Sequence, residues 1–312
     1  MLHQVLQLFE ILDSPRASGE AVVAHLNSLG ATQVVVSTTA MTGPKGSTDC
    51  VRVIIPGSRG RIAGGDAPTL GVIGRLGGLG ARPERIGFVS DGDGALAALS
   101  AASKLTTMAA NGDVLPGDVI VTTHVCPDAP TRPHHPVPFM DSPVEMAQMN
   151  AAEVDPTMDA ILSIDTTRGN RVINHCGIAI SPTVQQGYIL KVSDDLVRVI
   201  ETVTGRAAVV FPLSTQDITP YENGLHHLNS ILQPAVATDA PVVGVALVAE
   251  SAVAGSATGA TQEVHVAQAA QFAVEVAKYF GAGEVQFTDE SEFNQLVARY
   301  GSAKHLQTVG NQ

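Results

Sequence analysis

The sequence is poor in cysteine, in charged residues and in long apolar runs. Its three cysteines, Cys50, Cys126 and Cys176, are far apart and form no CxxC pair. An odd, widely spaced set of this kind argues against a disulfide framework and a thiolate zinc site. No stretch reaches the roughly 18 uninterrupted apolar residues that a membrane-spanning helix needs. The opening segment has no basic start and contains Glu10 and Asp13, so we expect no signal peptide and a cytoplasmic protein.

Basic residues are scarce as well. The 312 residues include 18 Lys and Arg against 30 Asp and Glu, which gives a formal net charge of −12. So acidic a surface repels phosphate backbones and anionic lipid, which argues against nucleic-acid and membrane partners. The partners that we expect are a small molecule and further copies of the same chain, in a homo-oligomer.

Apolar residues, glycine and proline are abundant. Hydrophobic residues make up 45% of the sequence, which is enough for a sizeable core. The 30 glycines and 18 prolines suit many tight turns. Although 312 residues exceed the usual size of one domain, large α/β folds often reach this length undivided. We therefore expect one α/β domain over residues 1–312.

Helical and strand patterns alternate along the chain. Apolar residues spaced three and four apart predict helices, and short β-branched or apolar runs predict strands. The order of these elements predicts a three-layer sandwich, with helices on both faces of a mostly parallel sheet. The predicted helices are 2–12, 17–29, 95–108, 193–204, 263–280 and 290–300, with a short one within 70–79. The predicted strands are 32–37, 51–55, 86–90, 118–125, 159–165, 176–181, 207–211 and 241–250.

The clearest predicted unit is a strand–helix–strand segment. A strand at 86–90 leads through a glycine-containing turn, 91–95, into an Ala-rich helix, and the strand 118–125 follows by a right-handed crossover. A Pro-rich loop, 127–143, leaves the carboxyl end of the second strand. Ligands of open α/β sheets bind at that edge, so the sequence predicts the functional site there.

His124 is the strongest single candidate for this site, because it lies at the end of a predicted strand in the sequence THVCPD. The last side chains of parallel strands point into the ligand cleft, where an imidazole can bind a metal or act as a base. Asp128 and His134 follow in the same loop as reserve ligands. A structural histidine that bonds to a loop carbonyl is the alternative, and an imidazole suits both roles.

Three aspartates lie at predicted strand ends. Asp91 and Asp93 occupy a strand-to-helix turn, where two nearby carboxylates can hold a divalent cation. Helix capping is the alternative, because acidic residues bond free amides in the first turn. Asp165 ends the apolar strand DAILSID, and a buried carboxylate needs a metal or a cationic partner. Arg168 and Arg171 are the candidates for such a partner.

The order of the elements resembles that of the co-catalytic zinc aminopeptidases and related exopeptidases. Segment 90–105 is similar to the part of that family in which a metal-bridging aspartate opens an Ala-rich helix, and segment 158–165 resembles its strand with a metal-binding aspartate at the end. The family's two metal-binding histidines fall at Gly64 and Thr261, and its paired glutamates fall near His124. The resemblance implies a metal-dependent hydrolase whose ligand set is changed in this chain.

Four further segments resemble the sequence motifs of an uncharacterised bacterial family, DUF1177. They are GGDAPTLGVIGRLGG, RPERIGFVSDGDGA, VTTHVCPDAPT and GSATGATQE. This resemblance implies no particular activity.

The leading hypothesis from the sequence is a hydrolase of an amide-like bond in a small metabolite or short peptide. His124 and Asp93 are the candidate catalytic residues, and a zinc or manganese ion would activate water beside them. The candidate metal ligands are Asp91, Asp93, His124, Asp165, Asp128 and His134.

Two alternatives remain open. A non-catalytic small-molecule-binding protein would have kept the fold and lost the metal centre, as Gly64 and Thr261 suggest. A metal-free hydrolase or lyase would instead use Cys126 or Cys176 beside a histidine.

Overall fold

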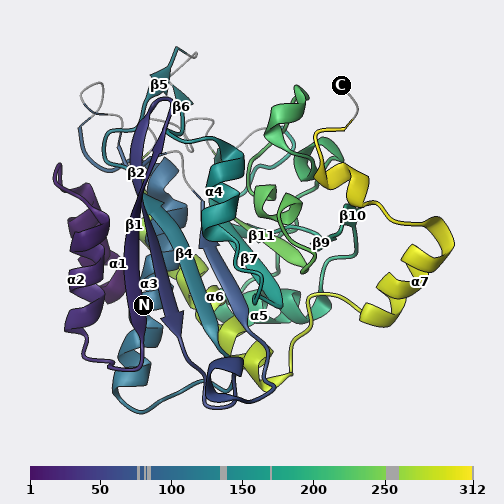
Figure 1. Ribbon diagram of the computed structural model, residues 1–312, viewed down its shortest axis with the longest axis horizontal. Coiled ribbons are helices and arrows are strands. Elements are labelled where there is room, and N and C mark those ends of the chain that lie inside the picture. The colour runs from purple at the N-terminus through teal and green to yellow at the C-terminus, as the bar shows by residue number, and fades with distance from the viewer. Residues whose placement is uncertain are drawn as a thin grey trace.

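A mixed nine-stranded sheet forms the centre of the computed structural model (Figure 1), which describes residues 1–75, 78–80, 82, 86–133, 139–168, 171–250 and 260–310. The strands lie in the order β1-β2-β4-β3-β7-β11-β9-β10, and β8 also pairs with β11. Neighbours among β4, β3, β7 and β11 run parallel, whereas the pairs further out are antiparallel. The strands are β1 (Val35–Gly43), β2 (Gly46–Ile55), β3 (Leu70–Gly74), β4 (Val119–Val125), β7 (Ala160–Arg168), β8 (Gly177–Ile180), β9 (Val184–Gln185), β10 (Tyr188–Ile189) and β11 (Val242–Ala249). A separate two-stranded ladder joins β5 (Thr131–Arg132) to β6 (Phe139–Met140).

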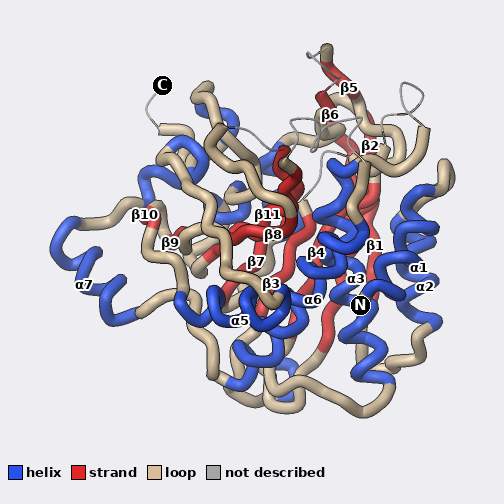
Figure 2. Tube along the Cα trace, turned by 180° about the vertical axis from the view of Figure 1, so that it is seen from behind, coloured by secondary structure: helices blue, strands red, loops and turns tan. Residues whose placement is uncertain are grey.

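Helices cover the two faces of this sheet unequally. One face carries α1 (Leu2–Asp13), α2 (Gly19–Ser28), α3 (Asp93–Ala110), α5 (Asp194–Thr204) and α6 (Glu263–Ala282), as Figure 2 shows. The other face carries α4 (Met146–Glu153) together with a 3₁₀ turn, Gln233–Val236, and loops. Helix α7 (Glu290–Tyr300) lies at the periphery. Among the described residues, no helix is both long and apolar enough to cross a membrane.

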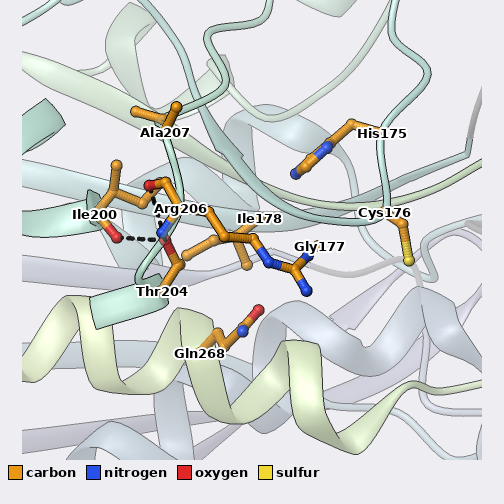
Figure 3. A pocket seen from close by; sticks show the side chains of 10 residues that line it. His175, Cys176, Gly177, Ile178, Ile200, Thr204, Arg206, Ala207 and Gln268 are labelled. Atoms are coloured by element: carbon orange, nitrogen blue, oxygen red, sulfur yellow. Dashed lines mark hydrogen bonds between the residues drawn. The ribbon is translucent and has the colours of Figure 1, made fainter. Parts of the chain in front are cut away.

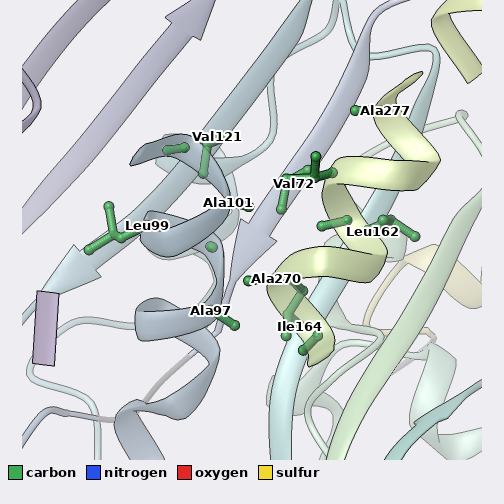
Figure 4. Close-up of a cluster of buried hydrophobic side chains, with 14 of the residues drawn as sticks. Val72, Ala97, Leu99, Ala101, Val121, Leu162, Ile164, Ala270 and Ala277 are labelled. Carbon is green, nitrogen blue, oxygen red and sulfur yellow. The ribbon is translucent and has the colours of Figure 1, made fainter. Parts of the chain in front are cut away.

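Alanines bring α3 and α6 close to the parallel strands (Figure 4). Small side chains let helix backbones approach one another and the sheet, while branched residues of the strands fill the space between them. The contact buries Ala97, Ala101, Ala270 and Ala277 of the helices against Val72, Val121, Leu162 and Ile164 of the strands. The packing holds the amino ends of both helices at the carboxyl edge of the parallel strands.

The prediction of a short helix within residues 70–79 is wrong, because β3 occupies residues 70–74 in the middle of the parallel strands. Its glycines permit close packing. A Cβ on Gly71 would lie 2.4 Å from Sδ of Met158, and one on Gly74 would lie 2.6 Å from the carbonyl oxygen of Gly94. Glycine has a low intrinsic strand propensity, so the pairing with β4 and β7 makes this segment a strand.

The strand predicted at 86–90 is also wrong. Ile86 is 92% exposed, and a 3₁₀ turn begins at Ser90. The parallel crossover is therefore β3–α3–β4.

Segment 207–211, also predicted as a strand, makes only an isolated bridge, between Val210 and Ile180. Elsewhere the α/β pattern predicted from the sequence is confirmed, with helices at both ends of the chain and strands at β4, β7 and β11.

Candidate functional site

Polar side chains form a row across the carboxyl ends of three parallel strands. The registers of β3 with its two neighbours place Arg75, the residue after β3, opposite His124 on β4 and Asp165 on β7. The amide of Arg75 continues the ladder by donating to the carbonyl of Ile164 at 2.8 Å. Residues opposite one another on paired strands share a face of the sheet. All three side chains therefore lie on the face that α4 covers.

Glu153, the last residue of α4, links two members of this row. Its Oε2 accepts a hydrogen bond from Nη1 of Arg75 at 2.5 Å, and its Oε1 accepts one from Nδ1 of His124 at 2.9 Å. The exposed fractions are 1% for Glu153, 2% for Arg75 and 0% for His124. Burial alone would raise the pKa of Glu153, but the Arg75 charge and the bond from His124 outweigh it and lower the pKa. Glu153 is therefore the ionised partner that compensates a buried guanidinium.

Two nitrogens of this network have unused hydrogen-bonding capacity. Nε of Arg75 and Nε2 of His124 are buried and have no partner among the described residues. Nearly all buried polar atoms are bonded to protein, water or a ligand. These two nitrogens are thus places where a bound molecule would add bonds that the chain itself does not supply.

Asp165 is the second buried acid of the row, and it is 7% exposed. Its Oδ1 accepts from the amide of Thr166 at 2.8 Å, and its Oδ2 accepts from the hydroxyl of Ser230 at 3.0 Å. Burial is the dominant influence and raises the pKa of Asp165 to about 7, although the charge of Arg75 and these two bonds lower it. The carboxyl group can consequently gain or lose a proton near neutral pH.

Replacing Asp165 by asparagine is expected to stabilise the protein above neutral pH. The raised pKa means that the native state binds the proton more tightly than the unfolded state, so the native state loses stability as pH rises from 3.8 towards about 7. A difference of about three pH units corresponds to about 4 kcal/mol as an upper bound. Asp165→Asn should therefore raise the free energy of urea unfolding at about pH 8 and change it little at about pH 4. Asp128→Asn, at an exposed position, is the control, and equal effects of the two variants at both pH values would contradict the assignment.

Asp93 and Asp91 lie at the amino end of α3, on the other side of the same edge. Asp93 is 4% exposed, and Thr261 donates a hydrogen bond to its Oδ1 at 2.8 Å. Burial raises the pKa of Asp93 well above its ordinary value; the bond from Thr261 opposes this, and the charges of Asp91, Glu263 and Asp165 add to it. The N-cap of α3 is Gly92, without a side-chain capping bond. Asp93 thus faces other acids and does not cap its helix.

Gly94 holds the amino end of α3 against the sheet. A Cβ at this position would lie 2.4 Å from the carbonyl oxygens of both Arg75 and Ile164. The backbone at the start of α3 therefore contacts the backbone at the ends of β3 and β7. This contact fixes the position of Asp93 near Asp165.

The structure places the sequence-predicted residues in different surroundings. Asp91, Asp93 and Asp165 are close enough for their charges to interact. His124 lies in the strand-end row, but its Nδ1 is bound to Glu153. Asp128 is exposed in the loop after β4. His134 lies outside the described residues.

The described contacts of Asp165 include a cation that was not among the two expected partners. Its carboxylate is bonded to Ser230 and to the Thr166 amide, and the cation whose charge acts on it is Arg75. Arg171 is exposed, and the side chain of Arg168 lies outside the described part of the chain.

Sequence reasoning missed Arg75 and Glu153. Arg75 directly follows the buried run LGVIG, and a charged residue at the end of an apolar strand is the same signal that identified Asp165. The signal was lost because residues 70–79 were interpreted as a helix. Glu153 lies in α4, which is not among the predicted helices because its eight residues have no clear apolar stripe.

Comparison with known proteins places the chain in a family and in a fold. The family model described as "Protein of unknown function (DUF1177)" matches residues 39–310. Among curated proteins, none matches. The structure is similar to LapA aminopeptidase of Legionella pneumophila, with a TM-score of 0.51 and 10% identity over 93% of this chain and 72% of that one.

Two other solved structures show the same similarity. The bottromycin maturation enzyme BotP has a TM-score of 0.52 and 15% identity over 88% of this chain and 69% of that one. Glutaminyl cyclase of an Acidobacteriales bacterium has a TM-score of 0.51 and 13% identity over 90% and 94% of the two chains. These similarities confirm the zinc-exopeptidase-like α/β fold that the sequence suggested.

The sequence resemblance to zinc exopeptidases predicts a divalent metal at this edge, and the described residues do not fit one. Nowhere in the described ranges are three or more His, Cys, Asp or Glu side chains placed to hold a metal ion. The guanidinium of Arg75 brings a fixed positive charge between His124 and Asp165, where it would repel a second cation. Thr261 bonds to Asp93 where the resemblance places a histidine ligand. The site is therefore built around a resident arginine.

Proposed function

The chain belongs to the DUF1177 family of proteins of unknown function, and because that membership assigns no activity, we propose one from the site. The protein binds a small metabolite or short peptide that carries an amino group, at the carboxyl edge of its parallel strands and without a metal ion. The observation that carries the proposal is the cluster of carboxyl groups around the buried Asp93 and Asp165, against which the described residues set one buried arginine, Arg75.

The charge balance of the edge favours a cationic group. Glu153 already compensates Arg75 through a direct ion pair. Asp91, Glu263 and Asp165 all raise the pKa of Asp93, so negative charge gathers around this buried carboxyl group. An ammonium group beside them would relieve the repulsion and the desolvation together.

The neighbouring polar atoms support binding of the rest of such a molecule. The unpartnered nitrogens of Arg75 and His124 lie in the same network and offer a donor and an acceptor. Ser230 bonds to Asp165, and Tyr221 bonds to Ser230. A ligand seated by its ammonium group would therefore find directional partners within the same edge.

Hydrolysis of an amide-like bond in the same ligand is the second candidate function. The observation that favours it is the pKa of Asp165, about 7, because a general base works best when its pKa lies near the operating pH. In this function the ionised carboxylate of Asp165 takes a proton from the attacking water, and the proton then passes to the leaving amine. A zinc- or manganese-dependent form would need ligands that the described residues do not assemble.

Calorimetry with leucinamide tests the binding proposal. Leucinamide has a free amino group, and N-acetyl-leucinamide is the matched probe that lacks the charge. We expect leucinamide alone to bind, and we expect Asp165→Asn to weaken binding at least about tenfold, the effect of losing one charged contact. Asp128→Asn should bind as the parent does. Equal affinity for the two probes would refute the proposal.

Two measurements on the same samples separate binding from hydrolysis. Release of ammonia from leucinamide in the presence of a chelator would establish metal-free hydrolysis, and its loss in Asp165→Asn would identify the base. Mass spectrometry of protein purified without a chelating tag should find no stoichiometric zinc or manganese. Stoichiometric metal that disappears in Asp91→Ala would instead establish the metal-dependent hydrolase.

A further inference from the structure

Cys176 carries the accessible thiol among the three cysteines. It is exposed and lies just before β8, whereas Cys126 is buried and Cys50 is half-buried. Burial raises the pKa of Cys50 to about 12 and that of Cys126 to about 11. Thiol chemistry requires the thiolate and access to it. Of the three side chains, only that of Cys176 is therefore suited to react with a molecule in solution.

An imidazole stands next to this thiol. Nε2 of His265, in the first turn of α6, lies 3.7 Å from Sγ of Cys176. Burial is the main cause of a lowered pKa at His265, and the nearby His175 and Arg206 lower it further. A neutral imidazole can accept the proton of the thiol. The pair thus has the donor, the acceptor and the distance needed to form a thiolate.

The pocket beside the pair is lined by a guanidinium, an amide and an imidazole. Its lining includes Cys176, His175, Arg206 and Gln268, between β8, α5 and α6. Figure 3 shows the guanidinium of Arg206, the amide of Gln268 and the ring of His175 pointing towards one another. Within the described residues, no carboxylate forms an ion pair with Arg206.

A positively charged side chain without an acidic partner among the described residues is unexpected in a protein whose net charge is −12. An exposed guanidinium with unpaired donors binds carboxylates in a two-pronged geometry. The pocket therefore favours a small molecule with a carboxylate on one side and an electrophilic sulfur on the other.

We propose that Cys176 and His265 form a reactive-thiol site that exchanges with a small anionic disulfide of the glutathione-disulfide class, bound through Arg206. His265 takes the thiol proton, and the Cys176 thiolate attacks one sulfur of the disulfide. A new S–S bond to Cys176 forms while the original S–S bond breaks. The second sulfur leaves as a thiolate and takes up the proton, so that one disulfide is consumed and one is formed. This reaction uses none of the acidic residues around Asp93 and Asp165 and does not depend on the function proposed for them.

Intact-protein mass spectrometry with two disulfides tests the proposal. Oxidised glutathione is the anionic probe, and cystamine is the cationic probe with the same reactive bond. We expect one mixed disulfide per chain, formed faster with oxidised glutathione, and none in Cys176→Ser. Arg206→Ala should slow the reaction with oxidised glutathione about tenfold and leave the reaction with cystamine unchanged or faster. Arg206→Lys, which keeps the charge but loses the two-pronged geometry, should retain part of the preference.

His265→Gln checks the role of the imidazole. It should slow the reaction with both probes, because the thiol loses its proton acceptor while the anion site stays intact. Thermal unfolding of each variant confirms that it is folded before rates are compared. Modification at Cys50 or Cys126, equal rates with the two probes in the parent, or an unchanged rate in both Arg206→Ala and His265→Gln would each overturn the proposal.

Discussion

Replacing Glu153 by glutamine is expected to lower the free energy of unfolding by about 3–5 kcal/mol, the cost of leaving a buried charge without its partner. The carboxylate is 1% exposed and serves both Arg75 and His124. Glutamine keeps one acceptor oxygen but carries no charge, so the positive charge of the buried guanidinium would be left uncompensated. Urea unfolding followed by circular dichroism measures the loss.

Two comparisons make this prediction specific. The double variant Arg75→Met, Glu153→Met removes both charges, and it should recover most of the stability because no uncompensated ion remains. Glu292→Gln breaks the exposed pair with Lys191 and should have no measurable effect. If Glu153→Gln and the double variant were equally unstable, lost packing and not an uncompensated charge would explain the lower free energy of unfolding.

The pH dependence of the Glu153→Gln effect has a defined direction. The pKa of Glu153 is lowered by Arg75 and His124 in spite of its burial. The stabilisation by this carboxylate is therefore complete above its ordinary pKa of 4.5 and is lost as pH falls through the folded value. The gap between parent and variant should narrow in acid, and a constant gap would contradict the ionised pair.

Replacing Gly94 by alanine is expected to lower the free energy of unfolding by about 3 kcal/mol, at the upper end of overpacking effects. The new methyl group would lie 2.4 Å from the carbonyl oxygens of Arg75 and Ile164. These oxygens belong to central strands and cannot rotate away as a flexible side chain could. The amino end of α3 must therefore move, and Asp93 must move with it.

Gly112→Ala is the matched control for this substitution. Gly112 has a φ of 84° and no atom within 4 Å of the added Cβ, so the cost is the backbone strain alone, about 1 kcal/mol. Gly94→Ala should also weaken leucinamide binding, whereas Gly112→Ala should not. Equal losses of stability in the two variants would refute the close contact between α3 and the sheet.

Elements with a strong local pattern could be predicted from the residues alone. Alternating helices and buried strands gave the α/β class, and the Ala-rich run after Asp93 gave α3. Ser193 and Gly205 marked the two ends of α5. Strand-end positions also identified His124 and Asp165 as members of one edge, because the carboxyl ends of parallel strands meet there.

The contacts of these residues depend on how distant segments pack and could not be predicted locally. Arg75 reaches the edge because glycine-rich β3 becomes a strand between β4 and β7, a pairing that has no local signal. Glu153 then bonds to His124 and Arg75 from α4, which covers the face of the sheet opposite to α3 and α6. Burial, which depends on all of these elements together, raises the pKa of Asp165. Residue types and periodicity are local properties of a chain, whereas burial and charge pairing between distant segments arise only when the chain is packed.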